Sequence, residues 1–222
     1  MKQSIIDLSY PLDAATPPFP GDPPAEIVVQ ATIPAEHPIG VPGAMNVSRL
    51  HTGLHVGTHM DAPFHFYRGG RTIDQVLLTQ AVGPAVLVNL GRKAAKAEIT
   101  VEELLPHEAA ITQTRRLILN TGWASHWGQP DYFTDFPVIS AAAAQLLVDW
   151  GVILVGIDTP SVDTHPYPVH FALLGNDRLI VENLTNLDHI QQTLFQFIAL
   201  PLKITARDAS PVRAVAILPS SV

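Results

Sequence analysis

Residues 140–157 read SAAAAQLLVDWGVILVGI and contain the strongest indication of the fold. Ser140 can cap a helix over Ala141–Trp150, and Gly151 can end it. Residues 152–157 then form an uninterrupted apolar run of strand length. A helix that leads directly into a fully buried strand is typical of α/β proteins. We therefore expect an α/β fold.

Other short apolar segments lie on both sides of this unit. They are rich in β-branched residues and are bordered by Gly, Pro, Asn or Asp, which favours strands. A second helix is indicated by the capping box Thr100-Val101-Glu102-Glu103, and we expect it to end near His107. Because strands outnumber helices, the sequence predicts a mixed sheet of mostly short strands with few helices. The remaining predicted strands are Glu26–Thr32, Met45–His51, Ala85–Leu90, Arg116–Asn120, Arg178–Glu182, Phe195–Ile204 and Pro211–Ile217.

The composition excludes several classes of protein. Of 222 residues, 47% are hydrophobic and 15% are charged, which excludes a disordered chain and suits a single domain over residues 1–222. The net charge is −7 and there is no basic run, which excludes a nucleic-acid-binding surface. There is no cysteine, and no apolar stretch approaches about 18 residues, so we expect no thiolate metal site and no contact with a membrane. A soluble, cytoplasmic protein is the resulting expectation.

The histidines are concentrated in one segment. Of ten histidines, four lie between His51 and His65, and residues 55–65 read HVGTHMDAPFH. The glycines and threonines of this segment oppose a helix, which excludes the H-E-x-x-H arrangement of helical zinc enzymes. On a strand, side chains alternate with period two, so His55, His59, Asp61 and His65 would share one face.

A straight strand would hold His55 and His59 about 13 Å apart, too far for one metal ion to bind both easily. We therefore predict a bend at Gly57 and a stiffened turn at Pro63. Two imidazoles and a carboxylate suit Zn²⁺ and, with further oxygen ligands, Mn²⁺. Polar residues on an ordinary loop are the alternative interpretation.

The predicted metal ligands are His55, His59 and Asp61. A catalytic zinc site keeps a position open for water, which leaves His65 available for proton transfer. A second ion would need Asp61 as a bridge and ligands from elsewhere in the chain. His170 and Glu182 are twelve residues apart, and Glu182 ends the apolar run Leu179–Val181. From the residues alone this pair is weak evidence for a site.

The whole segment 55–65 resembles the motif H-x-G-T-H-x-D-x-P-x-H of the cyclase-like metal-dependent hydrolases, a family that includes the bacterial kynurenine formamidases. The resemblance runs nearly from end to end. It also includes residues 16–22 (TPPFPGD), 156–163 (GIDTPSVD), 199–203 (ALPLK) and 208–215 (DASPVRAV).

The resemblance implies a site, a fold and an assembly. It implies that His55, His59 and Asp61 bind one divalent ion, that Asp61, His170 and Glu182 bind a second one, and that His65 is the catalytic acid/base. It implies an α/β fold built around a swivelling β/β/α unit, assembled into homodimers or homotetramers. One or two ions are expected per chain, most simply Zn²⁺, with Mn²⁺ as the alternative.

Three features depart from the formamidase pattern. Phe19 stands where the formamidases have a substrate-contacting Trp in the early proline-rich loop. Phe171 stands where they have a second His, directly after the one matched by His170. The loop Asp163–Val169 is shorter than in the formamidases. These changes leave the metal ligands intact and concern substrate choice.

The predicted function is therefore that of a metal-dependent hydrolase of aryl amides. N-formylkynurenine, cleaved to kynurenine and formate in tryptophan catabolism, is the leading substrate, and an isatin-type lactam or other cyclic amide is the alternative. A non-catalytic metal-binding module is the competing interpretation, and a serine hydrolase lacks its G-x-S-x-G motif. Phe19, Trp123 and Trp127 could line an aromatic pocket or belong to the core. Thr58, Asp158 and Ser161 could hold the ligating histidines or serve as turn residues.

Overall fold

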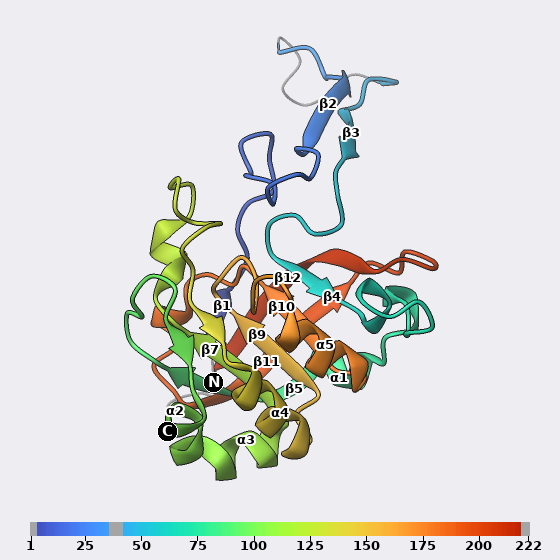
Figure 1. Ribbon diagram of the computed structural model, residues 1–222. Coiled ribbons are helices and arrows are strands. Elements are labelled where there is room, and N and C mark those ends of the chain that lie inside the picture. Colours follow the sequence, from blue (N-terminus) through green and yellow to red (C-terminus); the bar gives the residue numbers. More distant parts are fainter. Residues whose placement is uncertain (1–3, 36–41, 219–222) are drawn as a thin grey trace.

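An eight-stranded mixed sheet forms the centre of the computed structural model, which describes residues 4–35 and 42–218 (Figure 1). Its strand order is β1-β12-β11-β5-β7-β9-β10-β4, and β4 also pairs with β12, so that the sheet curls into a barrel-like shape. β5, β7, β9 and β10 run parallel, and the other neighbours are antiparallel. The strands are β1 (Ser4–Asp7), β4 (His59–Asp61), β5 (Val82–Asn89), β7 (Arg116–Asn120), β9 (Leu154–Ile157), β10 (Leu179–Glu182), β11 (Leu194–Pro201) and β12 (Ala209–Leu218).

Five short α-helices among the described residues accompany this sheet. α4 and α5 lie in front of the parallel strands in Figure 1, and an apolar core that includes Leu117, Val155 and Leu173 fills the space between the two layers. A second core on the other side of the sheet includes Met60 and Phe197. The helices are α1 (Leu78–Ala81), α2 (Val101–Leu104), α3 (Glu108–Thr114), α4 (Ala141–Asp149) and α5 (Pro168–Gly175), with single 3₁₀ turns η1 (Pro63–His65), η2 (Ile73–Gln75), η3 (Leu105–His107), η4 (Trp123–His126) and η5 (Leu187–His189).

The predicted α/β fold class is confirmed. The segment 140–157 forms α4 followed by β9, and the Ser140 hydroxyl accepts a hydrogen bond from the amide of Ala143 as a helix cap. The α-helix that begins after Thr100, α2, ends at Leu104, and the turn η3, which contains Pro106, reaches His107, where the helix was predicted to end; α3 then runs to Thr114 as a separate element. It ends at Arg115, whose φ of +59° is left-handed.

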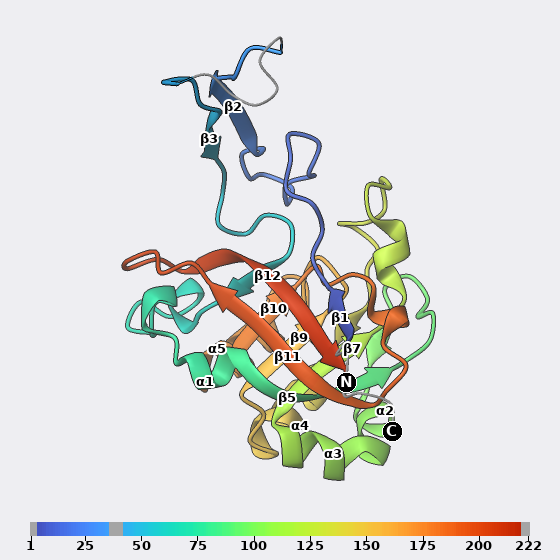
Figure 2. The same cartoon turned by 180° about the vertical axis from the view of Figure 1, so that it is seen from behind.

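One part of the chain stands away from this body. β2 (Glu26–Ala31) and β3 (Val47–His51) form a two-stranded arm that projects beyond the barrel-like sheet in both views (Figures 1 and 2). Ile27 lies opposite Leu50 in this arm, and the two side chains are 43% and 50% exposed. The remaining two-stranded sheet, β6 (Glu98–Ile99) with β8 (Val138–Ile139), packs near the helices.

The parallel strands place polar residues at one edge of the sheet. Asn120, Asp158 and Glu182 lie at or just after the carboxyl ends of β7, β9 and β10. In open α/β sheets the crevice outside these ends is the usual place for a ligand. No helix among the described residues is long and apolar enough to cross a membrane.

Candidate metal centre

The histidine-rich segment is bent rather than straight. Only His59–Asp61 forms a strand, β4, and Gly57 before it has a φ of +55°, which favours glycine and turns the chain. Pro63 begins the turn η1, which contains His65. The idea that the whole segment shares one strand face is therefore wrong, but the predicted bend at Gly57 and turn at Pro63 are confirmed. The bend brings the His55 ring to 5.2 Å from that of His59.

Pairing of β4 places its ligand candidates beside Glu182. His59 lies opposite Glu182 across the β4–β10 pair, and Nε2 of His59 is 3.3 Å from the Glu182 carboxylate. His59 and Asp61 point to the same side of β4, while Met60 between them is buried in the core. The backbone amide of Val162 donates to the second oxygen of Glu182 at 3.1 Å, which fixes that carboxylate.

The helix α5 adds His170 to the same site. Nε2 of His170 is 3.8 Å from Oδ2 of Asp61 and 3.6 Å from Oε1 of Glu182. The other oxygen of Asp61 is 2.8 Å from Nδ1 of His55 and 3.5 Å from Nε2 of His59. The two Asp61 oxygens thus face two different sets of donors, as a bridging carboxylate would.

These separations fit divalent ions. Two ligand atoms bound at about 2.0–2.1 Å with tetrahedral angles lie about 3.3 Å apart. In addition, both oxygens of Asp61 and Nε2 of His59 are buried without a hydrogen bond of acceptable geometry. Buried polar atoms are costly when they are unpaired. A cation held among His55, His59 and Asp61, with another among Asp61, His170 and Glu182, would satisfy all of them.

The second ring nitrogen of each histidine is already engaged. Nδ1 of His59 donates to the carbonyl oxygen of Gly57 at 2.9 Å, and Nδ1 of His170 donates to Asp163 at 2.6 Å. In His55 the roles are reversed, since Nε2 donates to Asp208 at 2.7 Å. Metal-ligating histidines normally hold their other nitrogen in this way. The nitrogens left for a metal are therefore Nδ1 of His55, Nε2 of His59 and Nε2 of His170.

The electrostatics agree with a site that prefers positive charge. Burial alone would lower the pKa of His55, but the nearby Asp61 and Asp208 carboxylates raise it to about 11. The pKa of His170 is raised in the same way to about 10, because Asp163, Asp61 and Glu182 outweigh its burial. Burial would raise the pKa of Asp61, but the surrounding histidines hold it well below its usual range.

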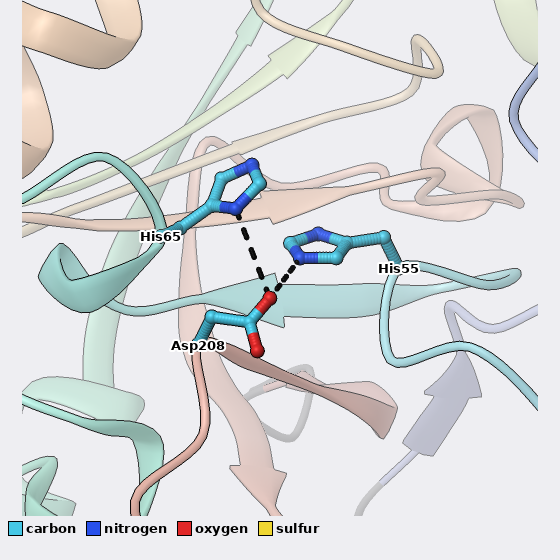
Figure 3. Close-up of side chains that lie close together, drawn as sticks. All are labelled: His55, His65 and Asp208. Atoms are coloured by element: carbon cyan, nitrogen blue, oxygen red, sulfur yellow. Dashed lines mark hydrogen bonds and ion pairs between the residues drawn. The ribbon is translucent and has the colours of Figure 1, made fainter. Parts of the chain in front are cut away.

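His65 differs from the other histidines of the site. Its side chain is 29% exposed, its ring centroid is 4.1 Å from that of His55, and Nδ1 lies 3.8 Å from the Asp208 carboxylate (Figure 3). Burial lowers its pKa below the ordinary value of 6.5. A neutral imidazole beside the metal-binding residues is able to accept a proton near pH 7.

A cavity of about 420 Å³ opens over these groups. Two aromatic pairs line it: Phe19 with Phe133, whose ring centroids are 5.8 Å apart, and Phe66 with Tyr167, whose centroids are 5.6 Å apart. Its size is in the usual range for sites that bind small molecules, and its walls suit a flat aromatic ring. Phe19 therefore lines the cavity, which is one of the two positions that the sequence analysis left open for it.

The two tryptophans do not line this cavity. Trp123 is buried in a small cluster with Tyr132 and Phe136, so the interpretation as core is confirmed for it. Trp127 stacks on Tyr10 with ring centroids 3.7 Å apart. Besides Phe19, the aromatic lining comes from Phe66, Phe133 and Tyr167, for which no sequence pattern predicted this role.

The predicted partners of the ligating histidines are also corrected. The Thr58 hydroxyl donates to the carbonyl of Asn183, Asp158 accepts from Thr121 and Ala124, and the carbonyl of Ser161 accepts from Thr159. The histidines are held by Gly57, Asp163 and Asp208 instead. Asp163 and Asp208 both lie within the segments that resemble the family, which was the signal available for them.

Comparisons with known proteins agree with this geometry. The profile of the family described as "Cyclase: Putative cyclase" matches residues 6–164. A kynurenine formamidase from Bacillus cytotoxicus is 35% identical over 214 residues, which cover 95% of each chain. Isatin hydrolase A from Labrenzia aggregata, solved with benzyl benzoate bound, is 25% identical with a TM-score of 0.84 and covers 97% of this chain and 94% of its own. A structure described as a potential metal-dependent hydrolase with cyclase activity shares the fold at 22% identity, with a TM-score of 0.77 over 99% of this chain and 100% of its own.

Proposed function

The chain belongs to the Cyclase family, and we propose that it is a metal-dependent hydrolase that cleaves the C–N bond of N-formylkynurenine to give kynurenine and formate. The observation that carries this proposal is the close donor set of His55, His59, Asp61, His170 and Glu182 beside a cavity with aromatic lining. The curated relatives named kynurenine formamidase, 32–35% identical over 95% of the chain, support the substrate.

We infer that the protein binds Zn²⁺, one or two ions per chain, with Mn²⁺ as the alternative. Three imidazole nitrogens and two carboxylates are ligands suited to zinc, and the two oxygens of Asp61 face separate donor sets. When bound, such ions lower the pKa of a coordinated water molecule to about 7 and polarise a carbonyl oxygen.

The side chains around the ions have separate tasks. In the reaction a C–O bond to water forms, the C–N bond of the formamide breaks, and the nitrogen leaves as an amine. His65 is placed to take the proton from the water at Nε2, the nitrogen remote from Asp208, and to return it to the leaving nitrogen. The aromatic walls orient the aryl ring and exclude water from it.

An isatin-type lactam is the second candidate substrate. The likeness to isatin hydrolase A favours it, since that protein superposes over nearly the whole chain. Phe19 favours it as well, because it departs from the indole of the formamidase pattern. A metal-binding module without catalysis is disfavoured by His65, which a closed structural site would not need.

Metal analysis and paired assays test the proposal. Purified protein should contain zinc in a ratio of one to two per chain and should hydrolyse N-formylkynurenine faster than isatin. Phe19→Trp should raise kcat/KM for N-formylkynurenine several-fold and Phe19→Ala should lower it by up to about tenfold, both with unchanged metal content. Faster opening of isatin by wild type and Phe19→Trp would favour the lactam. Protein without metal and without activation by zinc or manganese would overturn the proposal.

We further propose that the protein is a homodimer or homotetramer in which the β2–β3 arm contacts a second copy. Its apolar side chains Ile27, Val29 and Leu50 are 43%, 60% and 50% exposed. An isolated two-stranded hairpin is at best marginally stable in water, so this arm needs a partner surface.

A further inference from the structure

The carboxylate of Asp208 lies between His55, a predicted metal ligand, and His65, the predicted acid/base (Figure 3). It immediately precedes β12, and its backbone oxygen accepts the amide of Ala62 at 2.9 Å. The next residue, Ala209, pairs with Asp61 in the β4–β12 ladder. The position of Asp208 is therefore tied to the strand that carries the central metal-binding carboxylate.

We propose that Asp208 is a positioning residue that makes Nδ1 the metal-binding nitrogen of His55 and holds the ring of His65 beside it. This inference rests on the proposed metal-dependent function. The carboxylate of Asp208 faces Nε2 of His55, whereas Asp61 faces Nδ1. Asp208 would therefore act through the orientation of the His55 and His65 rings, without binding the ion itself.

The two ring nitrogens of His55 face two different carboxylates. Nδ1 is 2.8 Å from Asp61, and Nε2 is 2.7 Å from Asp208. A neutral imidazole carries one proton, and whichever nitrogen carries it cannot bind a metal. Because Asp208 can only accept a hydrogen bond there, it keeps the proton on Nε2 and leaves Nδ1 free for the ion next to Asp61.

His55 depends on this contact more than the other histidines do. His59 lies on β4 and is held by the carbonyl of Gly57, and His170 lies on α5. His55 belongs to none of the helices or strands described, and the hydrogen bond to Asp208 holds the ring nitrogen that faces away from Asp61. Loss of that carboxylate would free the ring to turn or to change its protonated nitrogen.

The same oxygen of Asp208 also faces His65. The distance to Nδ1 is 3.8 Å, and the rings of His65 and His55 are tilted by 36° with centroids 4.1 Å apart. A protonated His65 would thus have an acceptor at Nδ1 while Nε2 serves the substrate. One carboxylate orients both rings.

Asp208 could instead be a metal ligand with His55 and His65, since one atom of each lies within 4.8 Å of the others. That arrangement would use Nε2 of His55, the nitrogen that the proposal assigns to the proton. The two arrangements therefore differ in which nitrogen of His55 binds the ion, and this is measurable.

The experiment compares wild type, Asp208→Ala and Asp208→Asn, with Asp188→Ala as an exposed control outside the site. Zinc affinity is measured by competition with a chelator, and the ring nitrogens of His55 in the zinc-loaded protein are assigned by long-range ¹H–¹⁵N NMR. Because Asp208 is 34% exposed, both substitutions should leave the metal-free protein folded, with a melting temperature lowered only by the loss of the ion pair with His55. This melting temperature separates a local effect from misfolding.

Asp208→Ala should weaken binding of the ion at His55 by about 10–100-fold, the range found when such outer partners are removed. Asp208→Asn keeps an acceptor oxygen and should lose less, with Nδ1 of His55 still bound. Turnover at saturating zinc should fall in both variants with little change in KM, because the orientation of His65 is lost.

Zinc affinity and His55 nitrogen signals equal to wild type in Asp208→Ala would overturn the inference while leaving the proposed function intact. A zinc-loaded wild type with Nε2 of His55 bound would overturn it in favour of Asp208 as a ligand. Failure of wild type to bind zinc or manganese would instead remove the proposed function itself.

Discussion

Each histidine of the metal centre has one ring nitrogen held by the protein and one directed at a carboxylate. The holding groups differ, with a backbone oxygen for His59 and carboxylates for His55 and His170. These hydrogen bonds determine which ring nitrogen of each histidine is free to bind a metal ion. Among the described residues, the ring of His65 has no such short hydrogen bond, and the Asp208 carboxylate lies 3.8 Å from its Nδ1. This difference separates the residues that would bind metal from the one that would move protons.

Replacement of His65 by alanine should reduce turnover by about 10²–10⁴-fold, the usual contribution of a general acid/base. The metal content of His65→Ala should stay near that of wild type, because neither of the two proposed donor sets includes His65. His59→Ala, in contrast, should lose metal. Elemental analysis of both variants and an absorbance assay for kynurenine check this. A loss of metal in His65→Ala equal to that in His59→Ala would make His65 a ligand.

The pH dependence of stability should change sign when the metal is removed. In chelator-treated protein the pKa values of His55 and His170, about 11 and 10, lie above the ordinary 6.5. Their protonated forms therefore stabilise the fold fully below pH 6.5, and this contribution is lost as the pH rises toward 10 and 11. Metal ions compete with the same protons, so metal affinity rises with pH.

Melting curves from pH 6 to 10 test this. The melting temperature of the chelator-treated protein should fall with rising pH, whereas that of the protein in a fixed concentration of zinc should rise between pH 6 and 8. Two parallel curves would show that these histidines do not exchange protons for metal.

At the scale of the elements, the sequence predicted most where a signal was local. The segment 140–157 contains its own cap, stop and apolar run, and it forms α4 and β9 as expected. His55, His59 and Asp61 lie within seven residues, so a single bend suffices to bring them together. His170 lies on a helix that the sequence did not indicate, and Asp208 reaches His55 only because β12 pairs with β4. Contacts of this kind depend on the order of strands, which no local pattern contains.

The helix α5 is capped from a distance. Its N-cap residue, Tyr167, makes no side-chain cap, and Asp163 accepts the amides of Val169 and His170 at 2.6 and 3.1 Å. The other oxygen of Asp163 accepts Nδ1–H of His170. One carboxylate thus begins the helix and orients the ligand that the helix carries.

Asp163→Asn should therefore affect stability and metal binding together. Loss of the negative charge at the helix start should cost about 1 kcal/mol, or about 2–4 °C in melting temperature for a chain of this size. Zinc affinity should fall about 10–100-fold. Asp149→Asn is the matched control, because Asp149 is an exposed acid at the C-terminal end of a different helix, α4. It should change neither the melting temperature nor the zinc affinity. A lower melting temperature with unchanged affinity would limit Asp163 to capping.

At the scale of the whole molecule, the arm and the pocket are connected through the chain. The residues that lead from the body into β2 include Pro17, Phe19 and Asp22, which line the cavity, and the residues that follow β3 lead to His55. A partner surface that fixes the position of the arm would therefore also fix the pocket residues that precede β2 and follow β3. In a symmetric dimer each copy would supply that surface for the other.

Substitution of Ile27 and Leu50 by lysine should separate the protein into monomers. A fully buried Ile or Leu contributes about 1.5–3 kcal/mol, and two-fold symmetry counts each change twice, so association should weaken by about 1000-fold or more. The monomers should keep their metal, because no ligand lies in the arm, but their KM should rise as Phe19 loses its fixed position. Sedimentation measures the association, and steady-state kinetics measure the KM.

The control is Ile5→Lys, at an apolar side chain of β1 that is 64% exposed, and it should leave the assembly intact. A monomeric wild type would contradict the proposed assembly. Monomers of the double variant with unchanged KM would show that the arm joins the copies without shaping the pocket.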